Sequence, residues 1–150
     1  MNAAGQGILY ERFGDCRRLI SGRTALLNEY HGFISRLSSE LAPGSLIIDC
    51  HSFPSDLADI DICIGYNDDA SKPEQEMIDK ATHLFDRAGF KVGLNNPYSN
   101  SITPKKPIDY KSLMIEVNKR CYMNGGTLAR TVGYDIISGL VNDFYRLVLA

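Results

Sequence analysis

The stretch SLIIDCHSF, residues 45–53, decides the fold class, because it joins an apolar strand to polar side chains. Its first part, Ser45–Cys50, is a short and nearly continuous apolar run, which is typical of a strand covered on both faces. His51 follows this run directly. A second run of the same kind, Ser112–Val117 (SLMIEV), carries Glu116 in its interior. In α/β sheets the ligand site lies at the carboxyl ends of the strands, so these polar residues are the first candidates for chemistry.

Helical patterns alternate with the strands. Apolar residues at helical spacing predict an amphipathic helix over Ile20–Leu41, and Pro43 and Gly44 end it. The other predicted elements are helices over Pro73–Ala88 and Thr127–Leu149, strands over Gly7–Tyr10, Ile60–Gly65 and Phe90–Leu94, and a turn over Arg12–Arg18. This order predicts one α/β domain over residues 1–150, with a mixed, mostly parallel sheet.

Composition narrows the class of protein. The chain has 150 residues, 44% of them hydrophobic and 23% charged, which is typical of an ordinary globular domain. A net charge of −2 disfavours a broad electrostatic surface for nucleic acid. No apolar run approaches the roughly 20 residues of a membrane span. The first ten residues lack the basic flank and apolar core of a signal peptide, so we expect a cytoplasmic protein without a membrane or nucleic-acid partner.

The four cysteines do not suggest a redox or zinc-ribbon protein. No two of them are spaced as a CxxC pair. Cys50 and Cys63 lie in apolar runs, so we expect both to be small buried core residues.

His51 is a candidate metal ligand. A neutral imidazole binds zinc well, and a nearby carboxylate such as Asp49 can fix its tautomer. The alternative is an ordinary histidine that is hydrogen-bonded in a turn at the end of a strand.

Glu116 is a candidate general base. A glutamate inside an apolar strand is costly unless its charge is paired or used, and burial raises the pKa of a carboxyl group. The alternative is an edge strand on which Glu116 and Asn118 share a face toward water.

The loop after the third predicted strand offers amide, hydroxyl and phenol groups, among them Asn95 and Tyr98. Such groups suit recognition of a small polar substrate, but asparagine and proline also occur in ordinary turns. Lys119 and Arg120 suit an anionic ligand, and they are equally normal as surface charge.

Taken together, these segments resemble the N-formylglutamate amidohydrolase family. Four stretches in the same order carry the resemblance: LIIDCHSF (Leu46–Phe53), DICIG (Asp61–Gly65), NNPYSNSI (Asn95–Ile102) and MIEVNKRCYM (Met114–Met123). The resemblance implies a three-layer α/β/α fold of the zinc-exopeptidase type, related to carboxypeptidases and aspartoacylases.

The resemblance also implies roles for single residues. His51 matches a zinc ligand, and Glu116 matches the general base that takes a proton from zinc-bound water as it attacks the formyl carbonyl. The implied reaction splits the C–N bond of N-formyl-L-glutamate, or of a related N-acyl amino acid, into formate and the amino acid, a step of histidine degradation. Residues expected to hold the substrate carboxylates are Asn95, Tyr98, Lys119 and Arg120.

This sequence departs from the family at three places, one of which is Asn100, where the family often has glycine. The family has arginine directly after Glu-x-Asn, where Lys119 stands here. Family members also have an upstream segment with a histidine and an acidic residue that complete the zinc site, and this sequence is expected to be the C-terminal two-thirds of such a domain. The alternative to an active hydrolase is therefore an inactive, shortened member that keeps the fold and a carboxylate-binding pocket. An unpaired sheet edge would then favour self-association.

Overall fold

The computed structural model describes residues 12–13, 16–17 and 19–149, which form two compact units. One unit comprises residues 1–41 and 104–107, the other residues 42–103 and 108–150, and each is described by itself. In the first unit β1 (Arg12–Phe13) pairs antiparallel with β2 (Cys16–Arg17), so two short strands lie inside the segment predicted as a turn over Arg12–Arg18. The helix α1 (Ile20–Glu40) confirms the predicted helix. The strand predicted over Gly7–Tyr10 lies outside the described residues.

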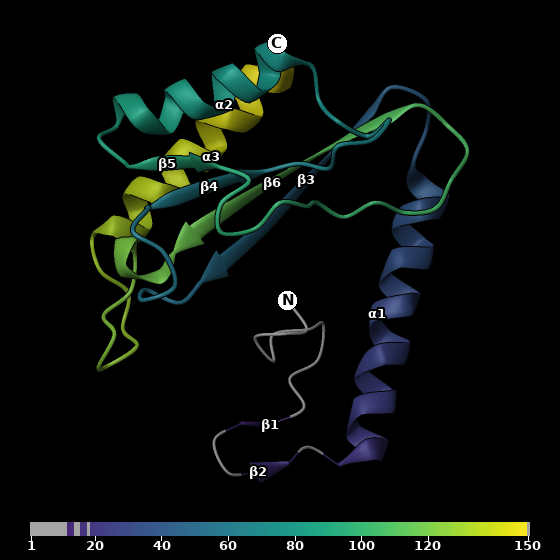
Figure 1. Cartoon of the computed structure of the whole chain (residues 1–150), viewed down its shortest axis with the longest axis horizontal. Helices are drawn as coiled ribbons and strands as arrows, with labels where there is room; N and C mark the ends of the chain where they lie inside the picture. Colours follow the sequence, from purple (N-terminus) through teal and green to yellow (C-terminus); the bar gives the residue numbers. More distant parts are fainter. Residues whose placement is uncertain (1–11, 14–15, 18, 150) are drawn as a thin grey trace. The chain divides into compact units, whose positions relative to one another are not determined.

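Four strands form the sheet of the second unit. Their spatial order is β3 (Ser45–Phe53), β6 (Tyr110–Asn118), β4 (Ile62–Gly65) and β5 (Val92–Leu94), as Figure 1 shows. β3 runs parallel to β6 and β4 parallel to β5, whereas β4 and β6 are antiparallel. The predicted α/β class is thus confirmed, and so is a mixed sheet in which two of the three pairings are parallel.

β3 is longer than predicted. It continues through His51 to Phe53, because β6 offers a parallel partner along the whole segment. The prediction that His51 directly follows the strand is therefore wrong, since this residue lies within it. β3 is also an edge strand of this sheet, which leaves Cys50 exposed, whereas Cys63 on β4 is fully buried as predicted.

β4 and β5 each begin two residues later than predicted. The Lys91 carbonyl oxygen accepts hydrogen bonds from the backbone N–H groups of both Asp61 and Ile62, at 2.8 and 3.2 Å. Sharing one carbonyl between two consecutive donors interrupts the regular ladder, so pairing starts only beyond this point.

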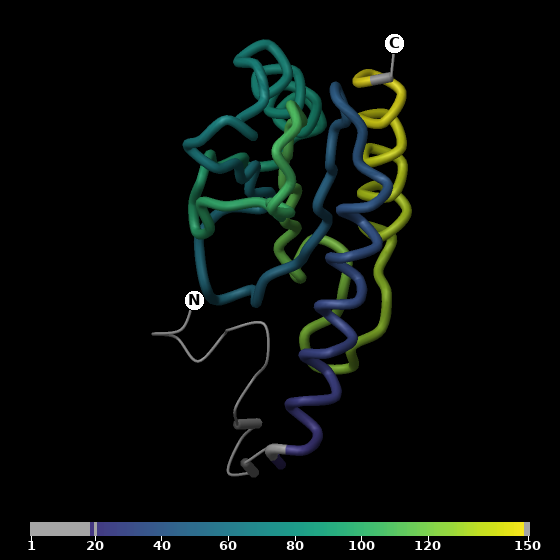
Figure 2. Tube along the Cα trace, turned by 90° about the vertical axis from the view of Figure 1, so that its right-hand side faces the viewer, coloured from purple at the N-terminus to yellow at the C-terminus, as the bar shows by residue number. Residues whose placement is uncertain are grey.

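Helices α2 (Gln75–Arg87) and α3 (Gly133–Leu149) cover one face of the sheet (Figure 1). The Tyr145 hydroxyl of α3 (yellow in Figure 2) lies 3.6 Å from the Cys50 sulfur of β3. The core between these layers consists of buried apolar side chains: Ile62, Ile64, Ile78, Ala81, Phe85, Leu113, Ile115, Val117, Ile137 and Phe144. None of the helices in the described part of the chain has the length and apolar character needed to cross a membrane.

The predicted glycine stop of α2 is confirmed. Gly89 adopts a φ of 87°, and its N–H donates to the Asp86 carbonyl while the Phe90 N–H reaches back to Phe85. This pair of bonds satisfies carbonyls at the helix end and requires a left-handed residue, which glycine provides without strain.

α3 begins six residues later than predicted. The Asn124 side chain accepts hydrogen bonds from the N–H groups of Gly126 and Thr127, both at 2.9 Å. Leu128 then takes a positive φ of 59°, and Met123 forms an isolated bridge with Arg130. A side chain that captures backbone donors stabilises a turn in place of the first helical turn.

The opposite face of the sheet carries a loop that follows β5. Its residues lie close to two glycines: a methyl group added at Gly65 would be 3.0 Å from the Asn100 carbonyl, and one at Gly93 would be 3.1 Å from the Asn96 carbonyl. The loop therefore packs directly on the backbone of β4 and β5, at positions that leave no room for a side chain.

We expect Gly65→Ala to lower the free energy of unfolding by about 1–3 kcal/mol, because the added methyl group also collides with the Met114 side chain. Gly139→Ala is the matched control, since Gly139 lies within α3 in open space and alanine favours a helix by about 1 kcal/mol. Urea denaturation of both variants measures the difference. Equal stability of the two variants would contradict this packing.

Candidate active site

Three polar side chains share one row of the sheet. In the register of the strands, His51 on β3 is the partner of Glu116 on β6, which is also the partner of Cys63 on β4. Partners on adjacent strands project from the same face. This face is opposite to α2 and α3, whose core contains the neighbouring residues Ile62 and Ile115.

Asp49 holds the His51 imidazole. It lies two residues earlier on β3 and so shares the face, with its Oδ1 atom 2.6 Å from His51 Nε2. The hydrogen bond from the imidazole raises the pKa of His51 above its ordinary value of 6.5, although partial burial opposes the shift. The buried Asp49 carboxylate also accepts the Ile102 N–H, at 3.2 Å, so both of its oxygens have partners. The side chain of His51 is half exposed. The residue also borders an open pocket of about 510 Å³, which is lined mainly from the side of α3 by Tyr134, Ile137 and Ser138.

Glu116 is buried in the central strand of this face. Its residue is only 8% exposed, and its Oε2 atom is buried without a hydrogen-bond partner. Burial raises the pKa of Glu116 from its ordinary value of 4.5 to about 7, with Asp49 adding to the shift and His51 opposing it. The alternative of an edge strand with Glu116 facing water is therefore wrong, because β6 is paired on both sides.

Cys63 is a neighbour of Glu116 that the sequence reading did not place at the site. Its thiol donates to the Tyr98 carbonyl at 3.4 Å, and burial raises the pKa of Cys63. The thiol thus stays protonated, and the neighbour of Glu116 on β4 is uncharged. The alternation along IDICIG indicates which face of the strand Cys63 occupies. Only the register of β4 against β6 shows that Cys63 lies beside Glu116.

The loop residues predicted to contact substrate have defined places. Asn95 takes a positive φ of 51°, and its side-chain oxygen accepts the Tyr66 N–H at 2.9 Å, which ties the loop to the end of β4. Tyr98 is half-buried against the apolar cluster of this face, which contains Phe53 and Met114. Asn95 therefore orders the loop, and Tyr98 lies near the row that contains Glu116.

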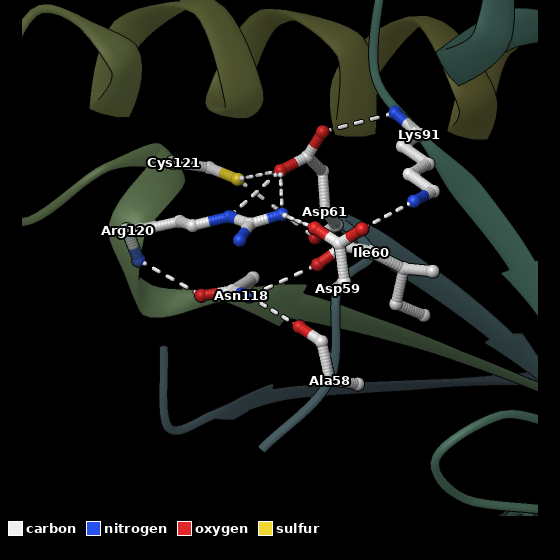
Figure 3. Close-up of polar contacts among 8 residues, drawn as sticks. All are labelled: Ala58, Asp59, Ile60, Asp61, Lys91, Asn118, Arg120 and Cys121. Carbon is white, nitrogen blue, oxygen red and sulfur yellow. Dashed lines mark hydrogen bonds and ion pairs between the residues drawn. The ribbon is translucent and has the colours of Figure 1, made fainter. Parts of the chain in front are cut away.

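Arg120 belongs to a polar cluster at the end of β6 (Figure 3). Its Nε and Nη2 atoms both lie 3.0 Å from Asp61 Oδ1, and Nη2 lies 3.7 Å from Asp59. Partial burial acts to raise the pKa of Asp61, but hydrogen bonds from the Lys91 N–H, Arg120 and Cys121 outweigh it and lower that pKa. Arg120 thus connects the end of β6, through ion pairs, to the segment that leads into β4.

Asn118 supports the same junction. Its fully buried side chain donates to the Ile60 carbonyl at 2.9 Å and accepts the Arg120 N–H at 3.1 Å. The short helix η2 (Lys119–Cys121) begins directly after Asn118, and its first residue, Lys119, is half-buried. The two predicted cations therefore differ, because the guanidinium of Arg120 is already paired with carboxylates.

Comparison with known proteins identifies the family. The family model for N-formylglutamate amidohydrolase matches residues 8–123. The chain belongs to the N-formylglutamate amidohydrolase family. A search of curated proteins found no match.

A solved structure of the N-formylglutamate amidohydrolase from Ralstonia eutropha JMP134 has a similar fold. The two chains superpose with a TM-score of 0.56 at 20% sequence identity, over 81% of this chain and 46% of the Ralstonia chain. This chain thus matches about half the length of that family member. The likeness supports the α/β fold, while the chemistry has to be argued from the side chains.

The zinc site that the family resemblance implies is incomplete in the described part of the chain. No group of three histidine, cysteine, aspartate or glutamate side chains there could hold a metal ion. His83 lies exposed on α2, so within the described part of the second unit His51 is the one imidazole on the face of Glu116. A catalytic zinc normally takes three protein ligands, and these residues alone do not fit it.

Replacing the buried carboxyl group of Glu116 should make stability less sensitive to pH. Because folding raises its pKa, the folded state binds a proton that the unfolded state has released, and the contribution of Glu116 to stability falls as the pH rises from about 4.5 to 7. We expect Glu116→Gln to gain about 3 kcal/mol relative to wild type between pH 4 and pH 8, measured by denaturant unfolding.

Glu76→Gln is the control for this measurement. Glu76 is an exposed carboxylate on α2, and its hydrogen bond with Lys80 lowers its pKa, so its replacement should act in the opposite direction. A stability difference between Glu116→Gln and wild type that stays constant with pH would contradict the raised pKa.

Proposed function

We propose that this chain takes part in hydrolysis of the C–N bond of an N-acyl amino acid of the N-formylglutamate type, with Glu116 as general base. One observation carries the proposal: a buried carboxyl group with an unpartnered oxygen and a pKa of about 7 lies in one row with His51. A general base works best when its pKa is near the working pH. Membership of the family supports the same reaction.

Glu116 would move one proton in two steps. Its carboxylate accepts a proton from water as the water oxygen attacks the acyl carbonyl, and the protonated carboxyl then delivers that proton to the leaving nitrogen. The C–N bond breaks, and the products are formate and the free amino acid. The unpartnered Oε2 atom is the natural acceptor, because its lone pairs are not used within the described structure.

His51 and Asp49 complete the polar row beside this base. Asp49 accepts a hydrogen bond from the Nε2–H group of His51. This leaves Nδ1 of the neutral imidazole as a hydrogen-bond acceptor or metal ligand. Zinc binding stays a prediction: His51 would supply one ligand, and the others would come from outside the described residues or from another chain.

Activity and metal content test the proposal together. We expect purified protein incubated with zinc to bind about one ion per chain and to release formate from N-formyl-L-glutamate. His51→Ala should lose the metal, and Glu116→Gln should keep it while kcat falls by about 100-fold or more, since a general base contributes factors of that size. Wild-type kcat/KM should rise with pH through about 7.

The control is Glu76→Gln, which should match wild type in zinc content and formate release. Zinc binding without formate release would contradict hydrolysis of this substrate. Absence of zinc and of formate release would favour the alternative, an inactive member of the family that keeps the fold.

Lys119 is the better candidate for the substrate carboxylate. Arg120 is already paired with Asp61 and Asp59, so a substrate would have to compete with both. We expect Lys119→Ala to raise KM for N-formyl-L-glutamate by about 10- to 100-fold, the effect of losing a hydrogen bond to a charged group. Arg120→Lys should destabilise the fold and leave KM unchanged. Steady-state kinetics separates the two, and a larger KM effect at Arg120 would reverse the assignment.

A further inference from the structure

The Ser101–Ile102 segment is held by residues from β3, from β6 and from the loop that follows β4. On the side of β3, the Ile102 N–H donates to Asp49 Oδ2 at 3.2 Å. On β6, the fully buried Ser112 hydroxyl donates to the Ile102 carbonyl at 2.6 Å and lies 2.7 Å from the Ser101 hydroxyl. Beyond β4, the Asn67 side chain contacts the backbone of Ser101. The partner of Asp49 thus has a fixed position.

Asn67 grips this segment with both ends of its amide. Its Oδ1 atom accepts the Ser101 N–H at 3.3 Å, and its Nδ2 atom donates to the Ser101 carbonyl at 3.2 Å. The same Nδ2 group lies 2.7 Å from Thr103 Oγ1 and 3.2 Å from Ser71 Oγ, so its two hydrogens are shared among three acceptors. A two-pronged amide contact of this kind fixes both the place and the orientation of the Ser101 backbone.

We propose that Asn67 is a positioning residue for the Asp49–His51 pair and acts through the Ser101–Ile102 segment. The contacts form one path: Asn67 fixes Ser101, the next N–H binds Asp49 Oδ2, and Asp49 Oδ1 binds His51 Nε2. Its consequence for catalysis rests on the proposed function, whereas its effect on His51 does not.

Asn67 is needed because Ser112 gives only one point of attachment. Both bonds of Ser112 converge on a single hydroxyl group, about which Ser101 and Ile102 can pivot. The amide of Asn67 supplies a second fixed point, in the loop that follows β4. Without it the Ile102 N–H can leave Asp49 Oδ2, and the carboxylate is then free to turn away from the imidazole.

The tautomer of His51 is the direct readout of this path. The Asp49 carboxylate can only accept, so the bond to Nε2 holds the proton of the neutral imidazole on that nitrogen. Nitrogen-15 NMR distinguishes the two ring nitrogens without any substrate. Wild type, Asn67→Ala and Asn67→Asp are compared at pH 9 with a chelator present, and Asn142→Ala on the exposed side of α3 is the matched control.

We expect wild type and Asn142→Ala to show the Nε2–H form of His51. In both Asn67 variants the signals should move toward those of the exposed His83, and kcat should fall about 10- to 100-fold with little change in KM, the effect of a misplaced group. Asn67→Asp keeps the acceptor for the Ser101 N–H but loses the donor, so it preserves the fold if Asn67→Ala does not.

Hydrogen exchange of wild type provides an independent check, because the Ile102 amide should exchange more slowly than that of the exposed Lys105. Folded Asn67 variants with unchanged His51 signals, or an unprotected Ile102 amide, would overturn the proposal. Loss of formate release in every protein, wild type included, would instead contradict the proposed function and leave the tautomer result standing.

Discussion

A carboxyl group buried in the central strand is the constraint on which the site depends. Glu116 is paired through its backbone on both sides, with β3 and β4, while one of its side-chain oxygens has no partner. Removing a carboxylate from water disfavours its charged form, so its pKa rises to about 7. The sheet thereby keeps a group that can be charged or neutral near neutral pH, at a cost in stability that its apolar core offsets.

The two faces of the sheet have different tasks. The face under α2 and α3 is wholly apolar at its centre, where Ile62, Ile115 and Phe144 are buried. The other face carries the polar row and is covered in part by the loop after β5, which approaches the backbone closely at Gly65 and Gly93. Because successive residues of a strand alternate between faces, one segment such as MIEV serves both tasks.

The sequence patterns predicted the elements better than their neighbours in space. Apolar runs and turn residues are local signals, so the strands, the end of α2 at Gly89 and the candidate roles of His51 and Glu116 were accessible. Register is not local. The central position of β6, the place of Cys63 beside Glu116 and the contact of Asn67 with Ser101 depend on which strands pair. The pairing of Arg120 with Asp61 depends in the same way on β4 and β6 lying side by side.

The charges around Glu116 determine how readily its carboxyl group ionises. Asp49 and Glu116 lie near one another, and His51 is the cation that opposes the rise of the Glu116 pKa. An N-formyl amino acid brings further negative charge, which would raise that pKa again and leave less of Glu116 ionised near neutral pH. Arg120 is poorly suited to offset this charge, because Asp61 and Asp59 already share its guanidinium. Lys119, which directly follows β6, is the proposed partner of the substrate carboxylate, and its positive charge would offset this effect.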